Sequence, residues 1–360
     1  MRVLLTINSV DPAGGGTTEA VLRLAGALAA AGADAHLAAH EVGVTLQHPE
    51  PGVRATLLAR GRDAWDRHIA AMSPDVIHDH GLWLRVNRDV AATARRAGVP
   101  RIVSTHGMLS PWALGHHAWR KRAAWLLFQR RDLATAAAVH ATSDAEAADV
   151  VAAGVGAPVS VIPHGVHLRP PAPRTPRDGL RRALFLGRLH PVKGLPALID
   201  AWALARPEGW ELVIAGPDAG DQLADLASRR DAAGLADAVR FEGLLGAEAK
   251  SELLGGSDLL VLPSLSENFG VVVAEALAAG VPAIVSRRAP WAAIERAGAG
   301  WWVEPEAGAL AGAIREATAL SDDERSAAGA RGRDLVGRDY AWPSVAARML
   351  ALYEAAAAAA

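Results

Sequence analysis

The sequence predicts an α/β protein with two doubly wound domains, each built on a parallel sheet. Three observations support this class: β-rich apolar runs alternate with Ala-rich helical segments, the runs are apolar throughout, and the rhythm stops once and then restarts. Continuously apolar strands are typical of parallel sheets that helices cover on both faces. A chain of 360 residues also suits about two domains of ~150 residues each.

The first half of the chain contains six β-rich runs with segments of helical length between most of them. These runs are VLLTI, DAHLAA, DVIHDH, RIVST, AVHATS and VSVIP. The helical segments include residues 17–31 and 87–97. This alternation predicts βα units, in which helices connect parallel strands.

A proline-rich segment separates the two halves. The stretch RPPAPRTPRDG, residues 169–179, is too rich in proline for a helix or a central strand. After it the rhythm restarts with ALFLGRL, WELVIAG, VRFEGLL, DLLVLPS, PAIVS and WWVEP. We therefore expect a first domain over 1–168, a linker over 169–180 and a second domain over 181–339. A C-terminal helix over 340–360 is expected to cross back to the first domain.

The composition excludes several classes of protein. Hydrophobic residues make up 51% and charged residues 21% of the chain, which describes a globular protein with a large core. The net charge of -2 gives no sign of a nucleic-acid partner, and the lack of cysteine excludes disulfides and thiolate sites. The apolar run Val3–Ile7 is too short for a signal peptide, and no apolar stretch reaches the ~20 residues of a membrane span. We expect a cytoplasmic protein.

Two glutamates lie eight positions apart in the stretch SENFGVVVAEALAAGVPAIVS, residues 266–286. Glu267 falls in a loop, and Glu275 falls inside an expected helix. Eight helical positions span up to ~12 Å, comparable to the distance from ribose to sugar in a nucleotide sugar. An ordinary strand–loop–helix with two solvated acids would give the same spacing. However, an acid inside an apolar run requires a partner.

The start of that helix offers an anion site between the two acids. Free backbone N–H groups and the positive end of the helix dipole favour a phosphate near residues 269–271. Gly270 would let a diphosphate approach the backbone closely. The stretch therefore predicts that Glu267 holds a transferred sugar and Glu275 holds a ribose.

Two cations follow another expected strand. GRLHPVKG places Arg188 and Lys193 five residues apart around a turn. Fixed cations of this kind stabilise the charge that grows on a departing diphosphate, and Arg can grip two phosphate oxygens. The alternative is that both are ordinary surface cations. The sequence has no P-loop and no acidic cluster that resembles a Mg²⁺ site.

Basic and aromatic residues alternate in the stretch HGMLSPWALGHHAWRKRAAWLLFQRR. Such a helix suits an anionic partner: a membrane surface, a lipid-linked diphosphate or a charged glycan. The alternative is a helix with a packed apolar face and solvated cations. The residues expected at an acceptor or membrane surface are Trp112, Arg120, Lys121 and Arg122.

Glycine and histidine residues follow other expected strands. Gly14, Gly16 and Glu19 form only an incomplete dinucleotide fingerprint, so a dehydrogenase is disfavoured. His78 and His80 share one strand face and could form a metal pair or line a cleft, but no third ligand stands out.

In these stretches the chain resembles the retaining glycosyltransferases of family 4. The matching stretches are GGGTTEAVLRLAGAL, VIPHGV, LFLGRLHPVKGL and SENFGVVVAEALAAGVPAIVS, the last with the Glu-x7-Glu pattern of the family. The resemblance covers nearly the whole chain. The family usually has Gly after the first Glu, whereas this chain has Asn268. The resemblance implies the GT-B fold, with two Rossmann-like domains and a central cleft.

The resemblance also implies roles for individual residues. His106, after a strand, would meet the donor sugar near its reacting carbon, and Gly16 would contact the diphosphate or the acceptor. The stretch FEGLLG, which contains Leu244, is expected to line the base pocket. We expect catalytic roles for His106, Arg188, Lys193 and Glu267. We expect donor contacts from Gly16, Arg188, Lys193, Leu244, Glu267, Asn268, Phe269, Gly270 and Glu275.

The implied reaction is a metal-independent, retaining sugar transfer, with no cofactor beyond the nucleoside-diphosphate sugar. The nucleotide base stays open between UDP, GDP and ADP. The expected acceptor is a saccharide or a lipid-linked molecule in cell-surface polysaccharide synthesis, with the protein in the cytoplasm or peripheral on the inner membrane face. The alternatives are a nucleotide-sugar 2-epimerase of the same fold and a non-catalytic nucleotide-sugar-binding subunit.

Overall fold

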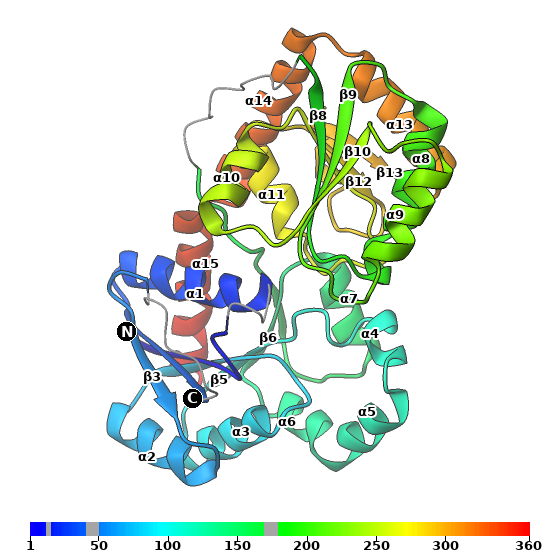
Figure 1. Cartoon of the computed structure of the whole chain (residues 1–360). Coiled ribbons are helices and arrows are strands. Elements are labelled where there is room, and N and C mark those ends of the chain that lie inside the picture. The colour runs from blue at the N-terminus through cyan, green and yellow to red at the C-terminus, as the bar shows by residue number, and fades with distance from the viewer. Residues whose placement is uncertain (12–15, 41–49, 169–178) are drawn as a thin grey trace. The chain divides into compact units, whose positions relative to one another are not determined.

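The computed structural model divides the chain into two compact units (Figure 1). Unit 1 comprises Met1–Gly165 and Trp342–Ala360, and unit 2 comprises Val166–Ala341. The expected linker over 169–180 lies outside the described residues except for its last two. The structure describes residues 1–11, 16–40, 50–168 and 179–360.

Unit 1 contains a seven-stranded parallel sheet in the order β3-β2-β1-β4-β5-β6-β7. Six of its strands coincide with the predicted runs, and β3 is a half-buried strand that the sequence pattern did not reveal. The strands are β1 (Arg2–Ile7), β2 (Asp34–His40), β3 (Arg54–Leu58), β4 (Val76–His80), β5 (Arg101–Ser104), β6 (Ala138–Ala141) and β7 (Val159–Val161).

Helices connect these strands, as the alternating pattern predicts. The two predicted helical segments correspond to α1 and α3. The helices of unit 1 are α1 (Gly16–Ala30), α2 (Arg62–Met72), α3 (Arg85–Ala97), α4 (Pro111–Gly115), α5 (Ala118–Ala124), the π-helical segment η2 (Trp125–Gln129), α6 (Arg130–Ala134), α7 (Asp144–Ala152) and α15 (Trp342–Ala358).

The C-terminal helix α15 is part of the core of unit 1. Its side chains Trp342, Met349 and Tyr353 are buried together with apolar residues of α1 and of the sheet. Gly165 is required where the chain meets this helix, since a Cβ there would lie 2.2 Å from the Trp342 ring. The last turns of the chain therefore stabilise the first sheet, although the whole of unit 2 separates them in sequence.

Unit 2 repeats the architecture with six parallel strands in the order β10-β9-β8-β11-β12-β13. All six coincide with predicted runs. They are β8 (Arg181–Leu186), β9 (Trp210–Ala215), β10 (Val239–Glu242), β11 (Leu259–Leu262), β12 (Ala283–Ser286) and β13 (Gly300–Val303). The helical segments are η3 (Pro191–Lys193), α8 (Leu195–Ala205), α9 (Leu223–Ala232), α10 (Ala247–Gly255), α11 (Val271–Ala278), α12 (Ala293–Arg296), α13 (Ala307–Ala319) and α14 (Asp322–Asp339).

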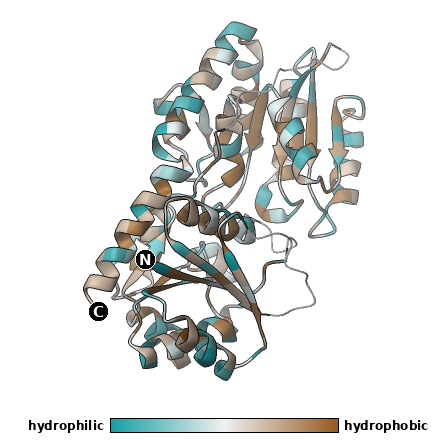
Figure 2. Ribbon diagram, turned by 90° about the vertical axis from the view of Figure 1, so that its left-hand side faces the viewer, coloured by the Kyte–Doolittle hydropathy of each residue, from teal (hydrophilic) through white to brown (hydrophobic). Residues whose placement is uncertain are grey.

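Each sheet forms the apolar centre of its unit. The strands β8, β11 and β12 are almost wholly buried, and Figure 2 shows the strands as largely brown. This burial explains why their sequences are apolar at successive positions and why the predicted α/β class is confirmed. No helix in the described part of the chain is long and apolar enough to span a bilayer.

The strand order reverses once in each sheet, between β1 and β4 in unit 1 and between β8 and β11 in unit 2. At such a reversal the connecting helices leave on opposite faces of the sheet. Ligands of open α/β sheets bind there, outside the carboxyl ends of the strands. A ligand site in unit 2 is therefore expected in the loops that follow β8 and β11.

Candidate functional site

Two of the predicted site residues meet at the strand-order reversal of unit 2. Lys193 lies on η3, after β8, and Glu267 lies in the loop after β11. Lys193 Nζ donates to Glu267 Oε2 at 2.5 Å, and both side chains are mostly buried. Residues 74 positions apart in the sequence thus form one ion pair beside the carboxyl ends of two central strands.

A close backbone approach holds this ion pair in place. Gly194 has a φ of +68°, and a Cβ there would lie 2.3 Å from the carbonyl oxygen of Pro263. Next to this contact, Leu265 N donates to Val192 O at 2.7 Å. Only glycine allows η3 to lie so close to the end of β11, which brings Lys193 within reach of the following loop.

Ser264 is a further contact of Glu267 that the sequence pattern did not reveal. Its Oγ donates to Glu267 Oε2 at 3.2 Å, and the residue is fully buried. Glu267 N also donates to Arg288 O at 3.2 Å. The bonds from Lys193 and Ser264 both reach Oε2 and hold the carboxylate in one orientation, and neither donor contacts Oε1.

Helix α11 begins directly after this loop. Gly270 precedes it with a φ of +78°, and no side chain in the described part of the chain caps its first N–H groups. Trp291 Nε1 donates to the carbonyl of Phe269 at 2.5 Å, and the Phe269 ring is buried against the rings of Trp291 and Tyr340. The Phe269 side chain therefore anchors the loop to the core of unit 2. The first backbone N–H groups of α11 remain as donors for an anion.

The second glutamate has the partner that its apolar surroundings require. Lys250, on α10, donates from Nζ to Glu275 Oε1 at 2.7 Å. The sequence indicates that Glu275 needs a partner but does not identify Lys250, because the two residues come from different helices. Asn268 lies half-buried between the two glutamates.

Arg188 and Leu244 lie at the surface of unit 2. Arg188 is exposed and makes no salt bridge with any described residue, so its guanidinium is available to an anion. Leu244 is 78% exposed, after β10. A single exposed apolar side chain is ordinary at a protein surface, so the expected place of Leu244 in the base pocket stays a prediction.

In unit 1, His106 occupies a strained turn after β5. Its φ is +49°, which is rare for a residue other than glycine. The Glu146 carboxylate, on α7, accepts from Thr105 Oγ1 at 2.5 Å and from Gly107 N at 2.6 Å, on both sides of His106. Burial raises the pKa of Glu146, but these hydrogen bonds outweigh it and hold the pKa below its usual value. An ionised Glu146 thus fixes the turn that carries His106.

Four further histidines lie near His106, two on β4, one on β6 and one after β7. His80 Nδ1 and His106 Nε2 share a hydrogen bond at 3.0 Å, and the His106 and His164 rings are stacked 5.8 Å apart. Burial lowers the pKa of His106 from 6.5 to about 4. Burial also lowers the pKa of the other four, which are His78, His80, His140 and His164.

Two of these histidines belong to a hydrogen-bond chain whose direction is fixed at one end. His140 Nε2 can only donate to the carbonyl of Ile162, at 2.7 Å, so a neutral His140 accepts at Nδ1 from Ser104 Oγ, at 2.6 Å. Ser104 Oγ then accepts from His78 Nε2 at 2.7 Å, and His78 Nδ1 accepts from the Tyr353 hydroxyl at 2.6 Å. Every donor in this chain faces an acceptor only while both imidazoles are neutral.

No group of three or more potential ligands in the described part of the chain is placed to hold a metal ion. The His78 and His80 rings are 4.1 Å apart between centroids, and hydrogen bonds to Tyr353, Ser104 and His106 occupy three of their four nitrogens. These two residues are part of the histidine cluster.

The remaining predicted residues of unit 1 are not part of the histidine cluster, and most of them are exposed. Gly16 is exposed at the first position of α1, and a Cβ there would meet nothing within 4 Å. Trp112, Arg120 and Arg122 are exposed. Lys121 instead turns inward, donates to the carbonyl of Ala113 and lies 5.9 Å from the Trp83 ring; burial lowers its pKa.

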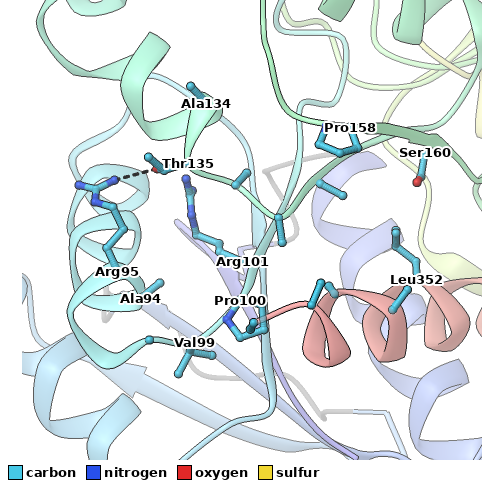
Figure 3. A pocket seen from close by; sticks show the side chains of 18 residues that line it. Ala94, Arg95, Val99, Pro100, Arg101, Ala134, Thr135, Pro158, Ser160 and Leu352 are labelled. Carbon is cyan, nitrogen blue, oxygen red and sulfur yellow. Dashed lines mark hydrogen bonds between the residues drawn. The ribbon is translucent and has the colours of Figure 1, made fainter.

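A pocket of about 500 Å³ also opens in unit 1, at the opposite edge of the sheet (Figure 3). Pro100, Arg101, Ala138 and Pro158, at the amino ends of strands, contribute to its walls. Arg101 lies in an ion pair with Asp79 at 2.9 Å. Because ligands of such sheets bind at the carboxyl ends, we do not assign this pocket to the candidate site.

Two family models match the chain in succession. The model described as Glycosyltransferase Family 4 matches residues 14–169, and the model described as Glycosyl transferases group 1 matches residues 172–334.

Characterised proteins show the same similarity along the chain. A glycogen synthase of Mycobacterium tuberculosis is 32% identical over 297 residues, which cover 79% of this chain and 69% of that protein. A GDP-mannose:cellobiosyl-diphosphopolyprenol alpha-mannosyltransferase of Xanthomonas campestris is 30% identical over 312 residues, covering 81% and 80%.

Solved structures share the fold over the full length. A sucrose-phosphate synthase from Thermosynechococcus elongatus has a TM-score of 0.80 at 24% identity and covers 100% of both chains. Anabaena Alr3699/HepE in complex with UDP and glucose has a TM-score of 0.79 at 19% identity and covers 99% of this chain and 100% of that one. At these identities the likeness establishes the fold alone.

The close approach at Gly194 leads to a prediction about stability. Gly194→Ala should lower the free energy of unfolding of unit 2 by roughly 2–4 kcal/mol, because the left-handed φ and the clash with Pro263 both disfavour a Cβ. Gly209→Ala is the matched control, with a φ of +74° and nothing within 4 Å, and should cost only about 1–2 kcal/mol. Urea unfolding of both variants measures the difference. Equal losses would contradict the proposed constraint.

The neutral histidine cluster leads to a prediction about pH. The folded pKa values lie below 6.5, so the unfolded chain takes up protons first as the pH falls. Stability should be fully present above pH 6.5 and decrease from there toward pH 4, by up to about 1.4 kcal/mol per pH unit for each histidine. Melting temperatures between pH 7.5 and 5 test this, with exposed His116→Gln as a control that keeps the slope. A flat profile would refute it.

Proposed function

The chain belongs to the retaining glycosyltransferases of family 4, and from this we propose that it moves a sugar from a nucleoside-diphosphate sugar to a hydroxyl of a saccharide or lipid-linked acceptor. The observation that carries the proposal is the Lys193–Glu267 ion pair beside the start of α11. It combines a cation, a carboxylate and free backbone donors at the carboxyl ends of the central strands. Those are the three kinds of group that an activated sugar with a diphosphate requires.

In this proposal the leaving diphosphate is stabilised by protein groups. Lys193 and exposed Arg188 supply two positive charges, and the N–H groups at the start of α11 supply donors. Lys193 can contact a phosphate oxygen while it remains beside Glu267, since an ammonium has three donors. The growing negative charge would then be neutralised without a bound metal.

The two glutamates would position the ends of the donor. Glu267 is held by Lys193 and Ser264 through Oε2, so its other oxygen can accept from hydroxyl groups of the sugar. Glu275 is paired with Lys250 through Oε1 and would accept from the ribose hydroxyls. Each carboxylate lies beside a lysine ammonium, and hydrogen bonds that involve an ionised group are the stronger ones.

In this proposal the sugar transfer itself needs no acid or base from the protein. In a retaining transfer the acceptor hydroxyl approaches on the face from which the phosphate departs, and a phosphate oxygen takes its proton. His106, held neutral in its strained turn by burial, would contribute a hydrogen bond to the sugar rather than a charge. We propose no protein base.

The acceptor proposal rests on one relative and on the surface of unit 1. The name of the Xanthomonas campestris relative states that it acts on a cellobiosyl-diphosphopolyprenol. The exposed Trp112, Arg120 and Arg122 provide aromatic and cationic contacts that suit a saccharide with a diphosphate. We therefore propose a role in cell-surface polysaccharide synthesis, with the protein in the cytoplasm or at the inner face of the membrane.

Substitution of the two glutamates should separate their roles. Glu267→Ala should lower kcat/KM by roughly 10²–10⁴, since about two hydrogen bonds to charged groups are lost at the reacting sugar. Glu275→Ala should mainly raise the KM for the donor. Steady-state kinetics distinguishes these outcomes, with Glu304→Ala, a surface carboxylate, as a control. The reverse assignment of effects would overturn the proposed roles.

The activity is tested by a panel of donors and acceptors. We expect a product with the anomeric configuration of the donor when UDP-, GDP- or ADP-sugars are offered with saccharide or polyprenyl-diphosphate acceptors. NMR of the product determines the configuration. Full activity should remain after EDTA treatment, because Arg188, Lys193 and α11 replace a metal. Inversion of configuration, or loss of activity on chelation, would contradict the mechanism.

A further inference from the structure

The segment from α4 to α6 in unit 1 displays large apolar side chains to solvent. Trp112 is 50% exposed, Trp119 is 71% exposed, and Leu126 and Leu127 are 80% and 81% exposed. Helices α5, η2 and α6 follow one another without a break from Ala118 to Ala134. Single exposed apolar residues are ordinary, but several on one helical stretch indicate an interaction surface.

The same stretch has a strongly one-sided surface charge. Residues 105–131 contain no Asp or Glu, although the whole chain has a net charge of -2. Asp132, the acid of α6, is buried and lies in an ion pair with Arg95 at 2.8 Å. The exposed cations there are Arg120, Arg122, Arg130 and Arg131. Arg130 and Arg131 follow Leu126 and Leu127 by one turn along the continuous helix, so apolar and cationic side chains occupy the same face.

The opposite face of this helix is anchored to the body of unit 1. Gln129 is buried and accepts from Trp83 N at 2.8 Å, and Leu133 is fully buried. Arg88 lies 5.7 Å from the Phe128 ring, and the rings of Trp83 and Trp125 are 6.2 Å apart.

Because the face of the helix that carries Gln129 and Leu133 packs on unit 1, Leu126 and Leu127 must point to solvent. The π-helical η2 segment contains both leucines as well as the inward Gln129, and such segments frequently occur at functional sites.

We propose that this surface, formed by Trp119, Leu126, Leu127, Arg130 and Arg131, docks the protein on an anionic lipid bilayer. The leucines and Trp119 would enter the boundary between headgroups and acyl chains, and the arginines would contact lipid phosphates. Apolar side chains flanked only by cations match an interface that is apolar inside and anionic outside. The inference goes beyond sugar transfer, and it stands whether or not the proposed donor site is correct.

Co-sedimentation of the full chain with vesicles tests the docking. At low salt the protein should bind vesicles of 30% phosphatidylglycerol and 70% phosphatidylcholine, but not vesicles of phosphatidylcholine alone. Leu126→Ser with Leu127→Ser should weaken binding by at least tenfold. Arg130→Gln with Arg131→Gln should weaken it by about 25-fold, since each cation near an anionic surface contributes about fivefold.

Matched controls come from unit 2. Leu204→Ser removes a leucine that is 61% exposed, and Arg338→Gln removes an exposed arginine; neither should change vesicle binding. Binding of nucleoside diphosphates should stay unchanged in all four variants, which separates this test from failure of the proposed donor site.

Three results would overturn the proposal. The first is no binding of the natural chain to the anionic vesicles. The second is loss of binding with the arginine pair but not with the leucine pair, which would mean attraction without insertion. The third is a dimer in sedimentation equilibrium that the leucine substitutions dissociate, which would mean that a second copy covers the surface.

Discussion

The close contact between η3 and the end of β11 determines the geometry of the candidate site. Gly194 lets the turn after β8 lie against Pro263, and this places Lys193 on Glu267. Two half-buried charges are acceptable there because each neutralises the other. The pair also leaves one carboxylate oxygen and further ammonium donors for a ligand. The packing of two loops at the strand-order reversal thus places two opposite charges together, so neither charge is left unpaired in a partly buried site.

The candidate residues of the two units differ in charge. In unit 2 each glutamate of the candidate site pairs with a lysine, Glu267 with Lys193 and Glu275 with Lys250, so each partly buried charge has an opposite charge beside it. In unit 1 burial keeps the histidine cluster neutral, while hydrogen bonds hold the pKa of Glu146, next to the His106 turn, below its usual value. A charged surface suits the diphosphate, and a neutral, rigid one suits a sugar.

The sequence was sufficient to predict the class of fold and to predict which candidate residues follow strands. It was not sufficient to predict which side chains those residues contact. Apolar runs revealed every strand except β3, whose half-buried pattern carries no strong period. The acid in the apolar run was expected to need a partner, yet Lys250 could not be identified because contacts between helices depend on packing. The Tyr353–His78 bond joins residues 275 positions apart, and Lys121 turns inward although its neighbours are exposed. Long-range contacts of this kind arise only from the tertiary structure.

The central claim is that Lys193 neutralises the diphosphate of the donor. Calorimetric titration of nucleoside diphosphates and of the corresponding free nucleosides into the natural chain and Lys193→Gln tests it most directly. The account predicts that the substitution weakens diphosphate binding by about 10- to 100-fold, the value of one hydrogen bond to a charged group, and leaves nucleoside binding unchanged. Equal diphosphate affinity in the two proteins would contradict it.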